Sequence, residues 1–255
     1  MDGTWIELAD GVLARRYAEL DLTVGLVIGD ERALVIDTRG DTAQGAEWAA
    51  AVRERTRLPI TAVLTHAHFD HCFGTSAFGP VPVLAHARCA EAIAHTADAQ
   101  RAEWVAHYRD RGDDATADAL AGSVPVPPAT APPRIDLGGR VVALRHLGRG
   151  HTDHDLLVDV PDAGVVFAGD LVEQGAPPDL AEADLAAWPA TLTALLALDR
   201  PVVVPGHGEP VDAAFVAEQR DRLQEIADLH RQVRQGTLTA AEAEQRSPYP
   251  GAPWE

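Results

Sequence analysis

One six-residue run limits what this chain can fold into more than any other feature: His66-Ala67-His68-Phe69-Asp70-His71. It follows directly after an apolar segment at residues 60–65, which has the length and composition of a buried strand. Imidazole and carboxylate are ligands of zinc and similar ions. Side chains alternate along an extended segment, so His66 and His68 project the same way, while Asp70 and His71 turn toward a second position. The run predicts a metal-binding loop, and it requires a fold that brings further ligands to that loop.

Hydrophobic patterning predicts strands and helices on both sides of this run. The predicted strands lie at residues 5–8, 12–17, 22–28, 33–37, 60–65, 81–85, 134–137, 141–147, 155–160, 164–168 and 202–204, and the predicted helices at 41–57, 87–108, 114–121, 184–198 and 212–235. Residues 122–133 carry five prolines, so we expect a surface connector without a helix or an inner strand. The order suggests two similar layered halves. We expect one domain spanning residues 1–255, with a helical insertion near 91–121.

Three later loops carry the same kinds of side chain. His151, Asp170 and His207 each follow a predicted strand, and each stands beside a glycine that permits a close backbone approach. A single histidine or Gly-Asp turn of this kind is common and indicates little. Together, in this order and after successive strands, the three residues indicate one site shared with the six-residue run.

With these residues together, the chain resembles the metallo-β-lactamase superfamily of hydrolases over residues 5–230. The resemblance implies a fold of class α/β (α+β), a four-layered αββα sandwich with its site at one edge between two sheets. The resemblance also implies which residues bind metal: His66, His68 and His151 would bind a first ion, Asp70, His71 and His207 a second, and Asp170 would bridge the two. Asp rather than Cys at position 170 resembles the glyoxalase II and lactonase-like branch more than the zinc β-lactamases with a cysteine ligand.

Two divalent ions about 3.5 Å apart can lower the pKa of a shared water from near 16 toward 7, which makes hydroxide available at neutral pH. We therefore expect a metal-dependent hydrolase with two zinc ions, iron or manganese being the other candidates. Its metal-bridging hydroxide would attack a small ester, thioester or lactone, and Asp70 would be both a ligand and the residue that orients the hydroxide. Two alternatives stay open on the same fold: a mononuclear iron sulfur dioxygenase or oxidoreductase, and a β-lactamase. A non-catalytic binding module is disfavoured because no ligand is missing.

Five other residues are candidates for contact with the ligands or the substrate: His154, Asp155, His86, Trp104 and Tyr108. Trp104 and Tyr108 lie four apart on one helical face, which favours packing against the sheets over substrate contact. His154, three residues after His151, would lie beside the metals or in solvent. Asp155 could orient a ligand imidazole through its remaining N–H. We expect His86 to be an ordinary buried histidine rather than a functional one.

Charge and cysteine content limit the class of partner. The formal net charge of −18 opposes binding to nucleic acid, and it is more typical of a solvated surface than of a site for a cationic substrate. Two cysteines, Cys72 and Cys89, are too few for a disulfide framework, and we expect Cys72 to pack rather than bind metal. No segment is apolar enough for a signal peptide or a membrane span. We predict a cytoplasmic enzyme with a small-molecule substrate, and the sequence leaves its oligomeric state open.

Overall fold

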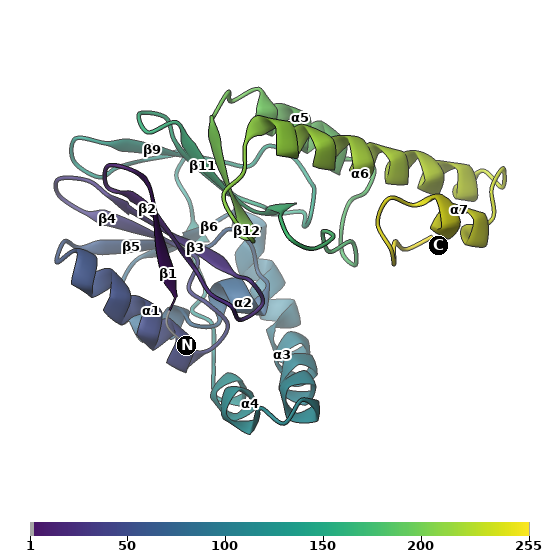
Figure 1. Ribbon diagram of the computed structural model, residues 1–255. Coiled ribbons are helices and arrows are strands. Elements are labelled where there is room, and N and C mark those ends of the chain that lie inside the picture. The colour runs from purple at the N-terminus through teal and green to yellow at the C-terminus, as the bar shows by residue number, and fades with distance from the viewer. Residues whose placement is uncertain (1–2, 255) are drawn as a thin grey trace.

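Two β-sheets lie face to face at the centre of the structure, a computed structural model that describes residues 3–254 (Figure 1). The first sheet contains, in spatial order, β1 (Thr4–Ala9), β2 (Val12–Arg16), β3 (Thr23–Ile28), β4 (Ala33–Ile36), β5 (Ile60–Val63), β6 (Val83–Ala85) and β7 (Ala129–Thr130). The second contains β12 (Val202–His207), β11 (Val165–Glu173), β10 (Leu157–Val160), β9 (Val141–Arg145) and β8 (Arg134–Asp136). Neighbouring strands are antiparallel from β1 to β4 and parallel from β4 to β7, and β11 pairs in parallel with β12.

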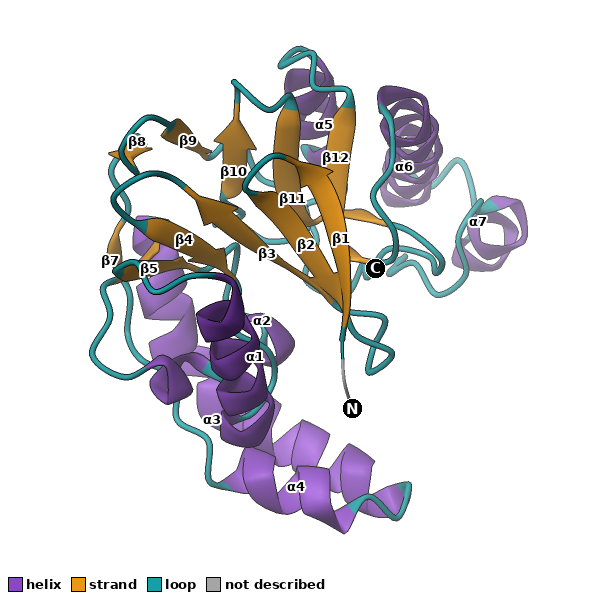
Figure 2. Cartoon of the chain, turned by 60° about the vertical axis from the view of Figure 1, so that its left-hand side comes forward, coloured by secondary structure: helices purple, strands orange, loops and turns teal. Residues whose placement is uncertain are grey.

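Helices cover the outer face of each sheet (Figure 2). Those on the side of the first sheet are α1 (Thr42–Arg55), α2 (Phe69–Cys72), the short 3-10 helix η1 (Thr75–Phe78), α3 (Ala87–Asp110) and α4 (Asp114–Ala121). On the second sheet lie α5 (Trp188–Leu196) and α6 (Ala213–Arg234), followed by α7 (Ala240–Arg246). The result is the predicted four-layered αββα sandwich.

The core between the sheets is built from aliphatic side chains of both. Val27, Leu34 and Ile36 of the first sheet belong to the same buried cluster as Val158 and Phe167 of the second. All nine residues of β11 are buried, because both faces of this strand are covered. A strand in that position carries a mostly apolar sequence. Fully burying each aliphatic or Phe side chain contributes about 1.5–3 kcal/mol. This core fixes the distance between the two sheets and hence between the loops at their edge.

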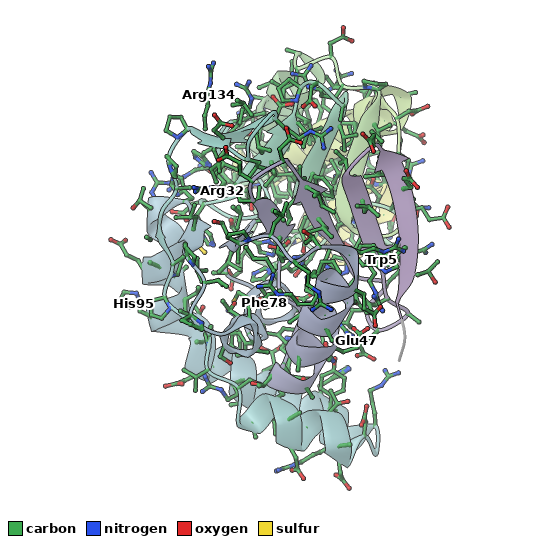
Figure 3. The ribbon with its side chains drawn as sticks, turned by 90° about the vertical axis from the view of Figure 1, so that its left-hand side faces the viewer. Trp5, Arg32, Glu47, Phe78, His95 and Arg134 are labelled. Atoms are coloured by element: carbon green, nitrogen blue, oxygen red, sulfur yellow. The ribbon has the colours of Figure 1, made fainter. Side chains whose placement is uncertain are left out.

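Helix α1 ties the outer layer to the end of β4. Asp41 caps the helix by accepting a hydrogen bond from the backbone N–H of Gln44, which satisfies one otherwise unpaired donor. The fully buried Trp48 donates its indole N–H to the backbone oxygen of Asp37, directly after β4, and its ring packs on Trp5 of β1. Figure 3 shows Trp5 and Glu47 on this side of the first sheet, and the exposed His95 on the outer side of α3.

Several predicted element boundaries differ from the structure. Strands β11 and β12 continue through residues 170 and 207, although glycines and Pro205 suggested that they ended before those residues. The reason is an irregular β11–β12 ladder with register shifts around Gly169, whose φ is +55°, so the strands bend without separating. The proline-rich connector contains β7, a two-residue edge strand, which is where a proline-rich segment can still pair.

Helix α7 was not predicted, although its capping box, Thr239 with Glu242, is a sequence signal for a helix start. The stretch predicted as a helical insertion, near residues 91–121, contains most of α3 and all of α4. We predicted a single domain of residues 1–255 into which this stretch is inserted, and that stays a prediction. In the described part of the chain, no helix combines the length and apolar character needed to cross a membrane.

Candidate metal centre

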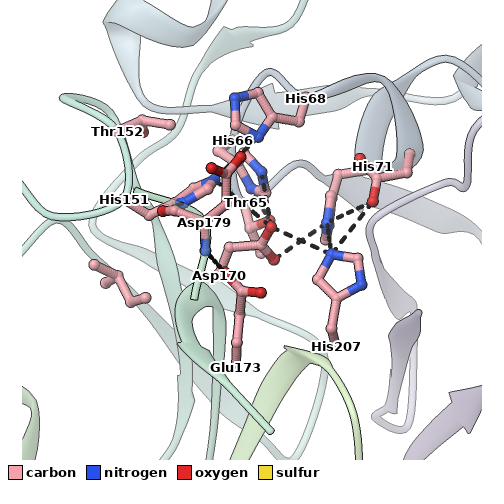
Figure 4. A network of polar contacts seen from close by, with 12 residues as sticks. Thr65, His66, His68, His71, His151, Thr152, Asp170, Glu173, Asp179 and His207 are labelled. Carbon is pink, nitrogen blue, oxygen red and sulfur yellow. Dashed lines mark hydrogen bonds and ion pairs between the residues drawn. The ribbon is translucent and has the colours of Figure 1, made fainter. Parts of the chain in front are cut away.

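The seven predicted ligands come together where strands of both sheets end (Figure 4). His66, His68, Asp70 and His71 follow β5, the last two on the first turn of α2. The other three come from the second half of the chain: His151 from the loop between β9 and β10, Asp170 from β11, and His207 from the end of β12. A Cβ at Gly206 would lie 1.8 Å from Asp170 Oδ1, so only glycine lets β12 pass this close to that carboxylate.

The side chains form two donor groups. His66, His68, His151 and Asp170, which we call the first group, each offer one atom within 4.8 Å of the others. His151 Nε2 lies 3.0 Å from His68 Nδ1 and 3.6 Å from Asp170 Oδ2, and His66 Nε2 lies 3.5 Å from the same carboxylate oxygen.

The second group consists of Asp70, His71 and His207. His207 Nε2 lies 3.3 Å from Asp70 Oδ2 and 3.4 Å from His71 Nε2, and His71 Nε2 lies 3.5 Å from Asp70 Oδ2. Asp170 reaches this group as well, since its Oδ1 is 3.2 Å from His71 Nε2 and its Oδ2 is 3.3 Å from His207 Nε2. One carboxylate therefore lies between the two groups.

The spacing and chemistry of these donors fit metal ions. Ligand atoms about 2.0–2.1 Å from a tetrahedral zinc ion are about 3.3 Å from one another, and the separations within both groups lie around that value. In addition, His66 Nε2 and Asp170 Oδ1 are buried without a hydrogen-bond partner. A buried polar atom without a partner lowers the stability of a fold. A cation between the donors would give both atoms a partner.

Three of the four pKa values in the first group favour the forms that bind metal. His68 is the exception: burial opposes its charged form, but the contact with Glu182 and the charge of Asp70 raise its pKa above the ordinary value. Burial, reinforced by the neighbouring His71, holds the pKa of His66 well below its ordinary value, and burial with His68 lowers the pKa of His151 to about 4. Burial would raise the pKa of Asp170, but the imidazoles of His71, His207 and His66 hold it well below its usual range. Neutral imidazoles around an ionised carboxylate are the ligand forms that a divalent cation needs.

In the second group, both imidazoles favour the protonated form. Burial opposes the charged form of both imidazoles, yet Asp170 and Asp70 raise the pKa of His71 and of His207 well above the ordinary value. Protons on these rings balance the carboxylates, and a divalent cation would replace them, so metal binding here would release protons.

Contacts behind the ligands come from residues that sequence reasoning missed. The buried Asp37 accepts a hydrogen bond from His71 Nδ1 at 2.8 Å, and it also accepts from the backbone N–H and the hydroxyl of Thr65. His207 Nδ1 donates to the backbone oxygen of Leu20 at 2.8 Å. Such contacts orient ligand rings and set which ring nitrogen faces the metal.

Another residue that sequence reasoning missed, Gln100, contacts the ligand loop from α3. Gln100 of α3 accepts a hydrogen bond from the backbone N–H of Phe69 and donates to the backbone oxygen of Ala67. Both partners of Gln100 are backbone atoms, which every residue has. No sequence signal therefore marks Gln100 as part of the site. Its two bonds fix the backbone on either side of His68.

Two of the five additional candidates lie behind the ligand loops. His154 Nε2 accepts a hydrogen bond from the backbone N–H of Ala67, between His66 and His68, while its Nδ1 donates to Asp153. Asp155 was expected to orient an imidazole, but its carboxylate accepts from the backbone N–H and hydroxyl of Thr152 instead. Burial raises the pKa of Asp155 to about 7. Asp155 thus closes the turn after His151.

The other three candidates lie on or beside α3. His86 caps the start of α3 and stacks on His146, with ring centroids 4.3 Å apart, and it is only partly buried. Tyr108 is buried and donates to Glu19. Trp104 was predicted to pack against the sheets, but its ring packs on Phe69 of α2, and it lines a pocket of about 500 Å³ that opens onto both donor groups.

Comparison with known proteins relates the whole arrangement to one family. The sequence model of the metallo-beta-lactamase superfamily matches residues 20–207. Acyl-coenzyme A thioesterase MBLAC2 of Homo sapiens is 28% identical over 233 residues, covering 78% of this chain and 79% of that protein. Metallo-beta-lactamase type 2 of Bacillus sp. (strain 170) is 25% identical over 206 residues, covering 78% and 72%.

Solved structures show the same fold. A metallo-beta-lactamase from Pontibacter korlensis has a TM-score of 0.68 at 22% identity, covering 88% of this chain and 99% of that one. The metallo-beta-lactamase FIM-1 from Pseudomonas aeruginosa, in its mono-zinc form, has a TM-score of 0.67 at 19% identity, covering 89% and 97%. These findings confirm the predicted fold class and the resemblance at the level of the superfamily. The glyoxalase II and lactonase-like branch stays a prediction.

Proposed function

The chain belongs to the metallo-beta-lactamase superfamily and is a metal-dependent hydrolase, and we propose that it cleaves a small ester, thioester or lactone with the help of two zinc ions. The observation that carries the proposal is the position of Asp170, whose two carboxylate oxygens lie within 3.6 Å of imidazole nitrogens of both donor groups. A carboxylate in that position can bridge two cations.

His66, His68 and His151 would hold one ion, Asp70, His71 and His207 the other, and Asp170 both. Two divalent ions in these groups would lower the pKa of a shared water and stabilise the negative charge that develops on a substrate carbonyl oxygen. Nitrogen and carboxylate donors suit zinc, and they also suit iron and manganese, so the donor set supports zinc without requiring it.

Asp70 has a second role in this proposal. Its Oδ2 contacts the imidazoles of His71 and His207, and the residue also lines the pocket. The remaining oxygen, Oδ1, is therefore available to accept a hydrogen bond from the attacking water and to orient it. Gln100 and His154 would keep the ligand loop in place while the substrate binds, through their bonds to the backbone of Ala67.

The relatives favour acyl transfer to water as the reaction class. One is named a thioesterase and another a β-lactamase, and both activities cleave a bond to an acyl carbon. The β-lactamase alternative has support from that second relative. Asp170 as the shared ligand favours the first proposal, on the resemblance drawn from the sequence. Iron-dependent oxidation on the same fold has no support among these relatives.

The test combines metal content with a substrate panel. Protein purified without added metal is measured for zinc, iron and manganese, then assayed against a thioester, a lactone, a simple ester, a carbapenem and a persulfide. We expect close to two equivalents of zinc per chain and turnover of the thioester, ester or lactone. That turnover should disappear with a chelator and return with zinc.

Three outcomes contradict the proposal. Full activity in metal-free protein would exclude metal-dependent hydrolysis. Faster turnover of the carbapenem than of every other compound would make the protein a β-lactamase. Stoichiometric iron together with oxidation of the persulfide would replace hydrolysis by the oxidoreductase alternative.

A further inference from the structure

Apart from the donor histidines and two glutamines, the pocket over the donor groups is lined by acids and small or apolar residues, without an arginine. Its acidic lining residues outside the donor groups are Asp21, Glu103, Glu173, Asp179 and Glu182. The sequence contains no lysine at all. Asp70 and Asp170 are set aside here, because bound cations would neutralise their charge. The lining is therefore more acidic than the metal chemistry requires.

That this pocket receives a ligand is supported independently of its charge. It opens onto both donor groups, since His68 and Asp170 of the first and Asp70 and His207 of the second line it, so a ligand in it would lie beside the metal ions. Its volume of about 500 Å³ lies within the range of small-molecule sites, roughly 300–1,000 Å³. One wall is apolar, since Trp104 stacks on Phe69 with ring centroids 4.3 Å apart and Leu20 lies beside the same opening.

Two of the acids have their charge balanced or buried. Asp21 makes hydrogen bonds of 2.6 and 2.9 Å to Arg16, so its charge is paired outside the pocket. Glu173 is buried, and its carboxylate accepts a hydrogen bond from the backbone N–H of Asp179. These two residues add little to the charge that a ligand meets.

Glu103, Asp179 and Glu182 remain as exposed charges of the pocket, and the carboxylate of Asp179 accepts a hydrogen bond from the backbone N–H of Ala181. Glu103 is exposed and makes no side-chain hydrogen bond or ion pair within residues 3–254. Glu182 is 65% exposed, and its nearest partner is His68 at 3.7 Å. Glu103 and Trp104 both line the pocket, so a positive group bound there has a carboxylate and an aromatic ring within the same site, both of which attract cations.

We propose that this pocket selects acyl compounds that carry an amine or quaternary ammonium group near the carbonyl, and that it discriminates against anionic ones. The inference rests on the proposed function and names its substrate class. An anionic group would face like charges without an arginine to bind it, and arginine is the residue that recognises carboxylate and phosphate best. Thioesters of coenzyme A and β-lactams, which are anionic, would be poor substrates. The net charge of −18 also favours cationic substrates, because it attracts them over a longer range.

The experiment uses three thioesters of one acyl chain that end in an ammonium, a hydroxyl or a carboxylate group. For the zinc-loaded protein at low ionic strength, we expect kcat/KM to be at least about tenfold higher for the ammonium compound than for the carboxylate compound. The ratio should shrink in 0.5 M salt, because salt screens exposed charges. Equal or faster turnover of the carboxylate compound overturns the inference.

A binding measurement separates this inference from the proposed function. The three matching amides, in which nitrogen replaces the thioester sulfur, are titrated into the protein by calorimetry. If no thioester is cleaved but the amides bind in the order ammonium, hydroxyl, carboxylate, the proposed function fails and the charge preference stands. If the thioesters are cleaved without a charge preference, the proposed function stands and this inference fails.

Glu103→Gln tests the residue that the inference depends on most. We expect it to lower the ratio of ammonium to carboxylate kcat/KM by about threefold, because one of the exposed charges is lost. Glu91→Gln is the matched control: it makes the same change on the same helix, about 18 Å along its axis, at an exposed position outside the pocket. An unchanged ratio in Glu103→Gln, or an equal change in Glu91→Gln, contradicts the assignment.

Discussion

The two donor groups share Asp170 but are supported in different ways. In the second group, His71 donates to the buried carboxylate of Asp37 at 2.8 Å. In the first group the outer contacts are longer, and two of them are neutral: His66 Nδ1 lies 3.0 Å from the hydroxyl of Thr65, and His151 Nδ1 lies 3.4 Å from the backbone oxygen of Asp179. The charged one, from His68 Nε2 to Glu182, spans 3.7 Å. Charge-assisted hydrogen bonds are roughly twice as strong as neutral ones. The orientation of His71 therefore depends on one buried carboxylate, whereas His66 and His151 are held by neutral groups.

Asp70→Ala should have the largest effect, because it removes a ligand of the second group and the residue proposed to orient the attacking water. We expect kcat/KM to fall at least about 10²–10³-fold, the scale for loss of one stabilising group at a reaction centre. Metal analysis should show a loss from the second group alone. Asp162→Ala, a surface acid outside both groups, is the control and should keep full activity. Retention of both metal equivalents in Asp70→Ala would contradict the ligand assignment.

Asp37→Asn should come next, and it tests the comparison directly. Asp37 has a φ of +61°, a conformation that asparagine also adopts readily, so the backbone should be unaffected. Loss of the carboxylate should weaken metal binding in the second group by about 10–100-fold. Competition with a chromophoric chelator measures both binding steps. Metal binding in the first group, which Asp37 contacts only through Thr65, should weaken less, and an equal or larger loss there would contradict the proposed difference between the groups.

His154→Leu should have a moderate effect, confined to the first group. It removes the acceptor of the Ala67 N–H, between His66 and His68, and we expect about a tenfold loss of metal affinity there. His154→Gln, which keeps an acceptor, should lose less. The same chelator titration measures both variants. Equal weakening of both groups by His154→Leu would mean that its effect is on folding rather than on ligand position.

Cys72→Ala should have the smallest effect. The thiol is fully buried next to His71 and contacts the backbone oxygen of Ala67 at 3.6 Å. We expect a loss of about 1 kcal/mol in the free energy of unfolding, typical of a small buried truncation, and unchanged metal content. Chemical denaturation and elemental analysis measure the two quantities. A loss of metal would show that the thiol belongs to the donor set after all.

Much of the fold and of the candidate site could be predicted because its signals are local. The run from His66 to His71 follows a buried strand, and this alone places four donors on one loop. His151, Asp170 and His207 follow the same rule, with a donor beside a glycine near the end of a strand. The structure brings all seven together, although β11 and β12 continue through Asp170 and His207.

The residues that support the ligands could not be predicted in this way. Asp37 reaches His71 because β4 and β5 pair in parallel with Ile36 opposite Val63, and that register cannot be derived from either strand alone. Gln100 contacts only backbone atoms of the ligand loop, and the oxygen of Leu20 that binds His207 belongs to no particular residue type. Asp155 shows the converse: its position near His151 suggested a contact with an imidazole, but its carboxylate bonds to Thr152.

The amino-acid sequence was sufficient for the donor chemistry, the spacing of the ligand loop and the order of strands and helices, because these depend on residue type and on the short periods of strand and helix. The class of fold followed from the family resemblance that the ligand residues carry. Only the tertiary structure decided which contacts stand behind each ligand and which charges face the substrate. Helical spacing placed Trp104 on one face of α3, but the docking of that helix decided that Trp104 and Glu103 line the pocket. Such contacts join residues far apart in the chain, so they depend on strand register and helix packing, which no local pattern encodes.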